Sequence, residues 1–215
     1  SPFGKKQSLI QKSIKTLSIF GIKFFINYSI KFLLNKFNDD LNVEKTIKKL
    51  GLEIIKLKKP INHNKSLKLI ASYNPSLLVS ILGSEIFKAK LLKLAPYGCI
   101  NLHSSLLPKY RGLIPTFWIL KNKEKESGVS VFFMDIGIDS GPIIIQKKFY
   151  ISKISHRDLI KKTKKLGMEA LAEAIKKIKN DEVILIPNDN KNKTYYSFPK
   201  RSDVQEFLLG GNTFY

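Results

Sequence analysis

The chain has few of the residues that build metal clusters, disulfides and nucleotide cradles. Cys99 is the only cysteine among 215 residues, so an intrachain disulfide and a cysteine metal cluster are both excluded. We expect a buried, inert thiol and a protein of the reducing cytoplasm. No second histidine or carboxylate stands at ligand spacing from His103, so we expect no metal. Walker and G-x-G-x-x-G motifs are also missing, which leaves a nucleotide cradle without support.

Acidic residues and arginine are scarce too. The chain has 38 Lys and Arg against 17 Asp and Glu, a net charge of +21, yet its only arginines are Arg111, Arg157 and Arg201. Nucleic-acid surfaces usually rely on arginine for bidentate contacts. The lysine-rich composition therefore indicates a general bias at least as much as a binding surface, although it favours anionic partners.

Long uninterrupted hydrophobic runs are missing as well. The most apolar early segment, 17–34, is interrupted by Lys23, Asn27 and Lys31, which makes it a poor membrane-spanning helix. Apolar residues recur at helical spacing over 8–37, with Gly21 as a possible kink. We predict an amphipathic core helix here in preference to a membrane-surface helix, and no membrane partner.

Helices and strands alternate along the rest of the chain. The expected helices are 8–37, 43–50, 65–73, 86–94, 115–121, 155–178 and 204–208, and the expected strands are 53–57, 77–82, 97–102, 128–134 and 142–151. This alternation predicts an α/β protein with a doubly wound, mostly parallel sheet. In such sheets ligands bind beyond the carboxyl ends of the strands.

Three polar side chains are placed to meet at that edge. Asn101 and His103 are two residues apart at the end of a strand, so they point to the same face. Asp139 lies in the glycine-rich loop 135–141. An amide can donate to an oxyanion, an imidazole can move protons, and a carboxylate can orient the imidazole. The bland alternative is a capping Asn, a satisfied His and a turn Asp.

Residues 98–112 (GCINLHSSLLPKYRG) carry a resemblance to a known family. They contain Asn-x-His, then Ser-Leu-Leu-Pro, then Arg-Gly, and this pattern resembles the signature of the folate-dependent formyltransferases. The stretch 128–144 (GVSVFFMDIGIDSGPII) is similar to a second block of that family. The family includes enzymes that act on methionyl-tRNA, on glycinamide ribonucleotide and on sugar amines. The resemblance implies a Rossmann-like formyltransferase fold.

The resemblance also implies the chemistry. An amine would attack the formyl carbon of 10-formyltetrahydrofolate, and no metal would be needed. Asn101 and His103 would stabilise the oxyanion, while Asp139 would hold His103 and relay the proton lost by the amine. Leu107 would help shape the folate site, although core packing explains it almost equally well. The positions implied to bind folate are Ser84, Glu85, Ile86, Phe87, Leu106, Ile136, Gly137 and Ile138.

The family normally opens with a β-α-β unit that this sequence does not show. We therefore expect a catalytic domain over 1–180 that lacks its first β-α-β unit, and a short C-terminal extension over 181–215. An absent strand would leave a sheet edge exposed.

The sequence leaves two candidate acceptors and one non-enzyme alternative. Too few residues follow the long helix for the RNA-binding barrel of the transfer-RNA enzyme, which favours a small-molecule or sugar amine, for example on a nucleotide. The lysine content favours methionyl-tRNA. A non-enzyme alternative is a basic RNA- or partner-binding protein on a formyltransferase scaffold. The partners expected are folate and an amine acceptor, with a nucleotide sugar or tRNA as the candidate anionic substrate.

Overall fold

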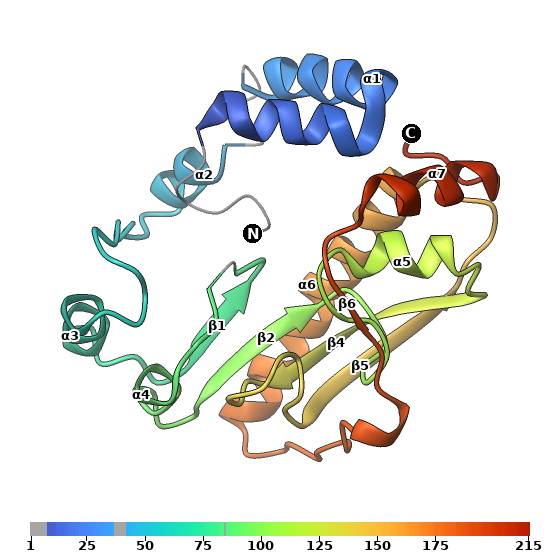
Figure 1. Cartoon of the computed structure of the whole chain (residues 1–215). Helices are drawn as coiled ribbons and strands as arrows, with labels where there is room; N and C mark the ends of the chain where they lie inside the picture. Colours follow the sequence, from blue (N-terminus) through green and yellow to red (C-terminus); the bar gives the residue numbers. More distant parts are fainter. Residues whose placement is uncertain (1–7, 37–41, 84) are drawn as a thin grey trace. The chain divides into compact units, whose positions relative to one another are not determined.

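The computed structural model describes residues 8–36, 42–83 and 85–215, and the chain divides into two compact units (Figure 1). One unit is Ser1–Lys58 with Pro199–Val204, and the other is Lys59–Phe198 with Gln205–Tyr215. The second unit contains the sheet and all three predicted catalytic residues. Each unit is described by itself.

The first unit contains α1 (Leu9–Lys36) and α2 (Val43–Lys49). Gly21 has φ 81° and ψ 171°, so it breaks α1 into two helical segments, as its lack of a side chain allows. The expected end of this helix at Phe37 lies outside the described residues. The prediction of a core helix is wrong, because none of the most apolar stretch of α1 is buried. The predicted strand 53–57 is wrong too, since its residues pair with no other strand among the described residues.

The second unit is built on a four-stranded sheet. Its strands are β1 (Leu78–Ile81), β2 (Cys99–His103), β4 (Glu126–Phe133) and β5 (Ile143–Tyr150), in the order β1-β2-β4-β5. The α/β class is confirmed, but the sheet is mixed and not mostly parallel. β1 runs parallel to β2, whereas β4 is antiparallel to both β2 and β5. A short loop joins β4 to β5, and only antiparallel neighbours allow such a connection.

Four helices lie within the described part of the second unit, and a fifth, α7, belongs to it only from Gln205 onward. They are α3 (Asn64–Ser72), α4 (Ala89–Leu92), α5 (Pro115–Lys121), α6 (His156–Lys179) and α7 (Arg201–Leu209). α4 is shorter than the predicted helix 86–94 because the Asn62 side chain takes up backbone groups there. Its Nδ2 donates to the Ile86 carbonyl at 2.7 Å and its Oδ1 accepts from the Lys88 N–H at 2.8 Å. These bonds replace the hydrogen bonds of a first helical turn.

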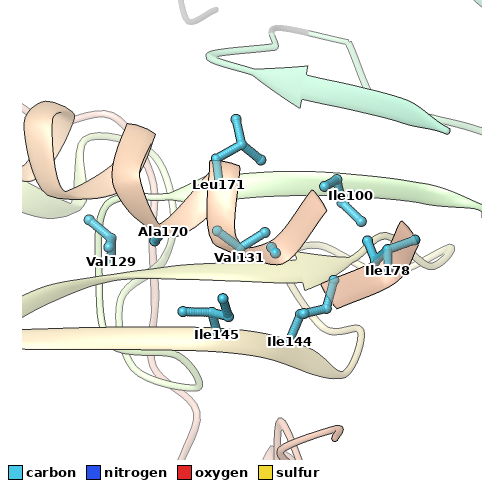
Figure 2. Close-up of a cluster of buried hydrophobic side chains, with 9 residues drawn as sticks. Ile100, Val129, Val131, Ile144, Ile145, Ala170, Leu171 and Ile178 are labelled. Carbon is cyan, nitrogen blue, oxygen red and sulfur yellow. The ribbon is translucent and has the colours of Figure 1, made fainter. Parts of the chain in front are cut away.

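The main core lies between α6 and one face of the sheet (Figure 2). Ile100, Val129 and Val131 from the strands meet Ala170 and Leu171 from α6, and all five are buried. Burying such side chains contributes about 25 cal/mol per Å² of apolar surface. α6 approaches β2 closely at Gly167, where an added Cβ would lie 2.8 Å from the Leu102 side chain.

A second cluster surrounds His156, the first residue of α6. Its ring packs against Phe117, Phe207 and Phe214, and its Nε2 lies 3.0 Å from the Thr116 hydroxyl. Burial lowers the pKa of His156 from 6.5 to about 4. The folded protein therefore holds this ring neutral at pH values where the unfolded chain would protonate it.

This difference predicts a loss of stability in acid. Because the folded pKa is depressed, the contribution of His156 is full above pH 6.5 and falls as the pH drops toward 4, by up to about 3 kcal/mol. Chemical denaturation at pH 7 and at pH 4.5 should therefore show a smaller loss of unfolding free energy for His156→Gln than for the unchanged protein. The exposed His63 gives the control, and an equal loss in His63→Gln and His156→Gln would contradict the assignment.

Candidate active site

β2 presents Asn101 and His103 on the face of the sheet that α6 does not cover. Side chains alternate along a strand, and the intervening Leu102, like Ile100, packs toward α6. Strand pairing places Ser80 and Phe132 beside Asn101, and Ser130 beside His103. One face of β2 thus builds the core while the other carries the polar groups.

The His103 ring lies between the backbone carbonyl of Tyr110 and the carboxylate of Asp139. Its side chain is only 8% exposed, and its Nε2 lies 2.7 Å from the backbone carbonyl of Tyr110. A carbonyl can only accept, so Nε2 carries a proton in this arrangement. In the neutral ring Nδ1 then bears the lone pair, and it faces Asp139 Oδ2 at 3.7 Å. The structure therefore brings the predicted His and Asp together.

Asp139 is fixed by the motif that follows His103. The Gly112 N–H donates to Asp139 Oδ2 at 2.8 Å, and Asp139 has φ 48°, a left-handed conformation that aspartate tolerates better than most residues. Its side chain is 14% exposed. One carboxylate oxygen of Asp139 thus lies near both the His103 imidazole and the Gly112 N–H. This contact holds the loop of Asp139 beside the ends of β2 and of the Arg111–Gly112 segment.

Asn101 differs from its neighbours, because its side chain forms no hydrogen bond with the residues that the structure describes. It is half-buried in the middle of β2. An amide placed this way keeps its donors available to a ligand. We infer from the geometry that, of the three residues, Asn101 has the donor group most available for a new hydrogen bond.

Ser130 anchors the loop between His103 and Tyr110, a role that the sequence did not reveal. This fully buried hydroxyl donates to the Ser105 carbonyl at 2.8 Å and accepts from the Leu107 N–H and from Gln146 Nε2. The same Gln146 amide also donates to the Leu107 carbonyl. These hydrogen bonds, centred on a buried hydroxyl, hold the loop in one conformation.

Arg111 connects the signature motif to the C-terminal part of the chain. Its guanidinium, in a residue 4% exposed, donates to the Asn188 carbonyl and side-chain oxygen and to the Asn190 side chain. The backbone adds to this connection, since β3 (Arg111–Gly112) pairs in parallel with β6 (Tyr195–Tyr196). Asn190 is the first residue of a 3₁₀ helix, Asn190–Asn192, which lies between Asn188 and β6 along the chain.

Asn188 continues this connection to the loop of Asp139. Its Nδ2 donates to the backbone carbonyls of Asp139 and Gly141, at 2.9 and 2.8 Å. Sequence reasoning missed Asn188 because its partners are more than 40 residues away. The Asn and Asp residues at 188–190 were the only signal, and a turn explains such a cluster equally well.

The positions predicted to bind folate fall into two groups. On the loop after β4, Ile136 and Ile138 are 81% and 45% exposed, and Gly137 lies between them. The Asp135 carboxylate supports this loop by accepting from the Gly137 N–H and the Ser140 hydroxyl. Exposed apolar side chains on a supported loop fit the flat ring of a pterin.

The second group is less uniform. Phe87 is buried against Leu67, Leu91 and Cys99, so it forms part of a core and does not line an open surface. The Glu85 side chain points toward Ile61, and its Oε2 accepts a hydrogen bond from the Ile61 N–H at 3.0 Å. Ile86 is 63% exposed, and Ser84 lies outside the described residues.

Leu106 and Leu107 have different surroundings. Leu106 lines a small cavity of about 80 Å³ together with Tyr110 and Ser127, and this cavity includes none of the three predicted catalytic residues. Leu107 is buried with Phe132 and Ile143, which agrees with its packing interpretation.

The described residues group no ligands for a metal ion, and their one cysteine is buried. Over 8–36, 42–83 and 85–215, no three His, Cys, Asp or Glu side chains are grouped to hold a metal ion. Cys99 is buried, and its burial raises the pKa of the thiol to about 11, which leaves it unreactive near neutral pH.

Comparison with known proteins identifies the domain. Residues 43–175 match the family described as "Formyl transferase". The methionyl-tRNA formyltransferase of Kosmotoga olearia is 34% identical over 154 residues, which cover 71% of this chain and 49% of that protein. That of Acetivibrio thermocellus is 37% identical over 127 residues, 59% of this chain and 41% of that protein. The chain therefore spans about half the length of the curated relatives that it matches.

Solved structures agree with the sequence relatives. A 4-N formyltransferase from Francisella tularensis is 30% identical, with a TM-score of 0.58 over 72% of this chain and 60% of its own. The sugar 3N-formyl transferase WlaRD, solved in the presence of dTDP and 5-N-formyl-THF, is 26% identical, with a TM-score of 0.58 over 73% of this chain and 53% of its own. With its fold, its signature residues and these relatives in agreement, the chain belongs to the formyl transferase family.

Proposed function

We propose that this chain carries the catalytic centre of an enzyme that transfers a formyl group from 10-formyltetrahydrofolate to an amine. The observation that carries the proposal is the placement of His103 Nδ1 3.7 Å from Asp139 Oδ2, on the same sheet face as the Asn101 amide. This is a base with a charged partner, next to an unsatisfied donor. Acyl transfer needs both of these elements.

Each residue then has a distinct task. The Asn101 amide donates to the formyl oxygen as negative charge develops there. His103 keeps its Nε2 proton on the Tyr110 carbonyl, so Nδ1 accepts the proton that the attacking amine loses. The nearby Asp139 carboxylate stabilises the imidazolium that results. The new C–N bond forms to the amine, the bond to the folate nitrogen breaks, and His103 returns its proton to that nitrogen.

Folate supplies a formyl group that is already activated by its bond to nitrogen. The residues of this chain that fit it best are Ile136, Gly137 and Ile138, whose exposed loop ends at Asp139. Ile86 and Leu106 are further candidates from neighbouring segments. The mechanism requires no metal ion.

For the acceptor, we favour an amine on a nucleotide-linked sugar. This is supported by the Francisella tularensis 4-N formyltransferase and by WlaRD, which was solved with dTDP. Methionyl-tRNA is the second candidate, supported by the names of the relatives found by sequence. The net charge of +21 agrees with either anionic acceptor.

One assay separates these candidates. The purified chain is mixed with 10-formyltetrahydrofolate and either dTDP-3-aminofucose or methionyl-tRNA, and formation of tetrahydrofolate is followed. Release with the sugar nucleotide supports the first acceptor, and release with the charged tRNA supports the second. Binding of folinic acid, measured by calorimetry, tests the donor side alone. Absence of both release and folinic acid binding, with salt-sensitive RNA binding, would establish the non-enzyme alternative.

Asp139 provides the most direct test of the mechanism. In Asp139→Asn the remaining carbonyl oxygen can still accept from the Gly112 N–H, but the negative charge near His103 is lost. We expect turnover to fall at least ~100-fold, and His103→Ala to show a similar loss. Asp158→Asn is the control, since it changes an exposed carboxylate at the start of α6 that does not touch His103, and it should stay within about threefold of the unchanged protein. Near-normal turnover in Asp139→Asn would refute the mechanism.

Asn188 should act as a positioning residue for the same carboxylate. Asn188→Asp keeps an oxygen for Arg111 but removes both N–H donors to the Asp139 loop. We expect kcat to fall about tenfold or more while KM for folate changes little, because a small displacement of a catalytic group is costly.

The control for Asn188 is its neighbour in the same network. Asn190→Asp also retains a contact with Arg111, but among the hydrogen bonds of the described residues none joins Asn190 to the Asp139 loop. Because both variants keep a contact with Arg111, each should change the melting temperature of the protein by a similar amount. Equal kcat in the two variants would show that Asn188 has only a structural role.

A further inference from the structure

α1 is an exposed apolar surface that the formyl transferase assignment does not use. It lies outside residues 43–175, which match the family. Its stretch Ile10–Leu34 is long and apolar enough to cross a membrane by length and composition, and none of its most apolar part is buried. Water-exposed apolar surface of this extent usually marks a site of interaction.

The two segments of α1 each carry an apolar stripe. In the first, Ile10, Ile14 and Leu17 recur at helical spacing and are 72%, 62% and 37% exposed. In the second, Ile22, Ile26 and Leu33 share one side and are 58%, 50% and 57% exposed. Lys23, Asn27 and Lys31 follow at four-residue spacing on another side of the second segment. Each segment therefore combines an exposed aliphatic stripe with lysines, although the kink changes the direction of the stripe.

The charge of this helix has one sign. Residues 8–36 contain five lysines and no aspartate or glutamate. The lysines are Lys12, Lys15, Lys23, Lys31 and Lys36. A protein partner would usually face a mixture of charges, whereas an acid-free lysine helix fits a surface of uniform negative charge.

The break at Gly21 decides between crossing a bilayer and lying on it. It divides α1 into 9–20 and 22–36, and each segment is shorter than the roughly 20 residues that a span requires. Rings gather beside the break, where Phe20 stacks on Phe24 at 4.5 Å and Phe24 stacks on Tyr28 at 5.9 Å. Aromatic residues of this kind favour the membrane–water interface.

We propose that α1 is a membrane-docking element that lies in the interface of an anionic lipid bilayer. Its aliphatic and aromatic side chains enter the boundary of the acyl chains, and its lysines contact the lipid phosphates. This reverses the expectation of a core helix with no membrane partner. It does not depend on the proposed function, because the lipid surface is a separate partner.

The test is co-sedimentation of the full chain with vesicles. We expect binding to vesicles of mixed phosphatidylcholine and phosphatidylglycerol, weak binding to pure phosphatidylcholine, and loss of binding in high salt. Lys12→Gln/Lys23→Gln should weaken binding about tenfold. The matched control is Lys164→Gln/Lys165→Gln, which removes two exposed lysines from α6 and should leave binding within about twofold.

The apolar contribution needs its own pair of variants. Ile22→Ser/Ile26→Ser should lower binding to anionic vesicles about tenfold or more, since it removes two aliphatic side chains from the stripe. The control, Ile184→Ser/Leu209→Ser, changes two aliphatic residues that are 81% and 88% exposed in the second unit. Circular dichroism of each variant verifies that the helical content is retained.

Four results would overturn the proposal. Equal binding to neutral and anionic vesicles would show that charge does not drive binding. An equal loss in the control pairs would show that α1 is not the binding surface. Resistance of the bound protein to alkaline carbonate would indicate a span. Self-association that Ile22→Ser/Ile26→Ser abolishes, without vesicle binding, would show that a second copy of the chain covers α1.

Discussion

The buried guanidinium of Arg111 is the interaction on which the arrangement of the site depends. A charge removed from water is costly unless hydrogen bonds satisfy it. Its partners here are the neutral oxygens of Asn188 and Asn190, which lie almost 80 residues further along the chain. Both terminal nitrogens of Arg111 are hydrogen-bonded there, while its buried Nε has no partner among the described residues, so these bonds hold the C-terminal segment against the signature motif. Asn188 then extends the same network to the backbone around Asp139.

One face of the sheet forms the hydrophobic core, and the other face carries the polar residues of the candidate site. Toward α6, β2 and β4 present Ile100, Val129 and Val131, which form a dry core. On the other face, Asn101 and His103 stand beside Phe132 and Ser130. Because side chains alternate, each strand serves both purposes without compromise. The polar face stays rigid because hydrogen bonds of Ser130 fix the adjoining loop.

Charge has different consequences in different parts of the chain. The exposed lysines of α6 cover the solvent side of a helix whose other side is the core, so they need no partner. α1 combines its lysines with exposed apolar side chains, and these require cover from water. The same composition thus has an ordinary explanation in one helix and indicates an interaction surface in the other.

The sequence by itself determined the α/β class, most of the helices and strands, the buried Cys99 and the family. Local spacing was enough for these, since periodicity and short motifs depend on near neighbours. It also placed Asn101 and His103 on one strand face. It failed for the strand 53–57 and for the start of α4, where the Asn62 side chain replaced helical hydrogen bonds.

Only the tertiary structure decided which partners these residues meet. The 3.7 Å approach of Asp139 to His103, the Tyr110 carbonyl that fixes the ring, and the hold of Asn188 on the loop all join segments distant in sequence. The sequence also did not predict the antiparallel pairing of β4 or the exposure of α1. Burial and hydrogen bonding depend on what lies across the fold, and no local pattern contains that information.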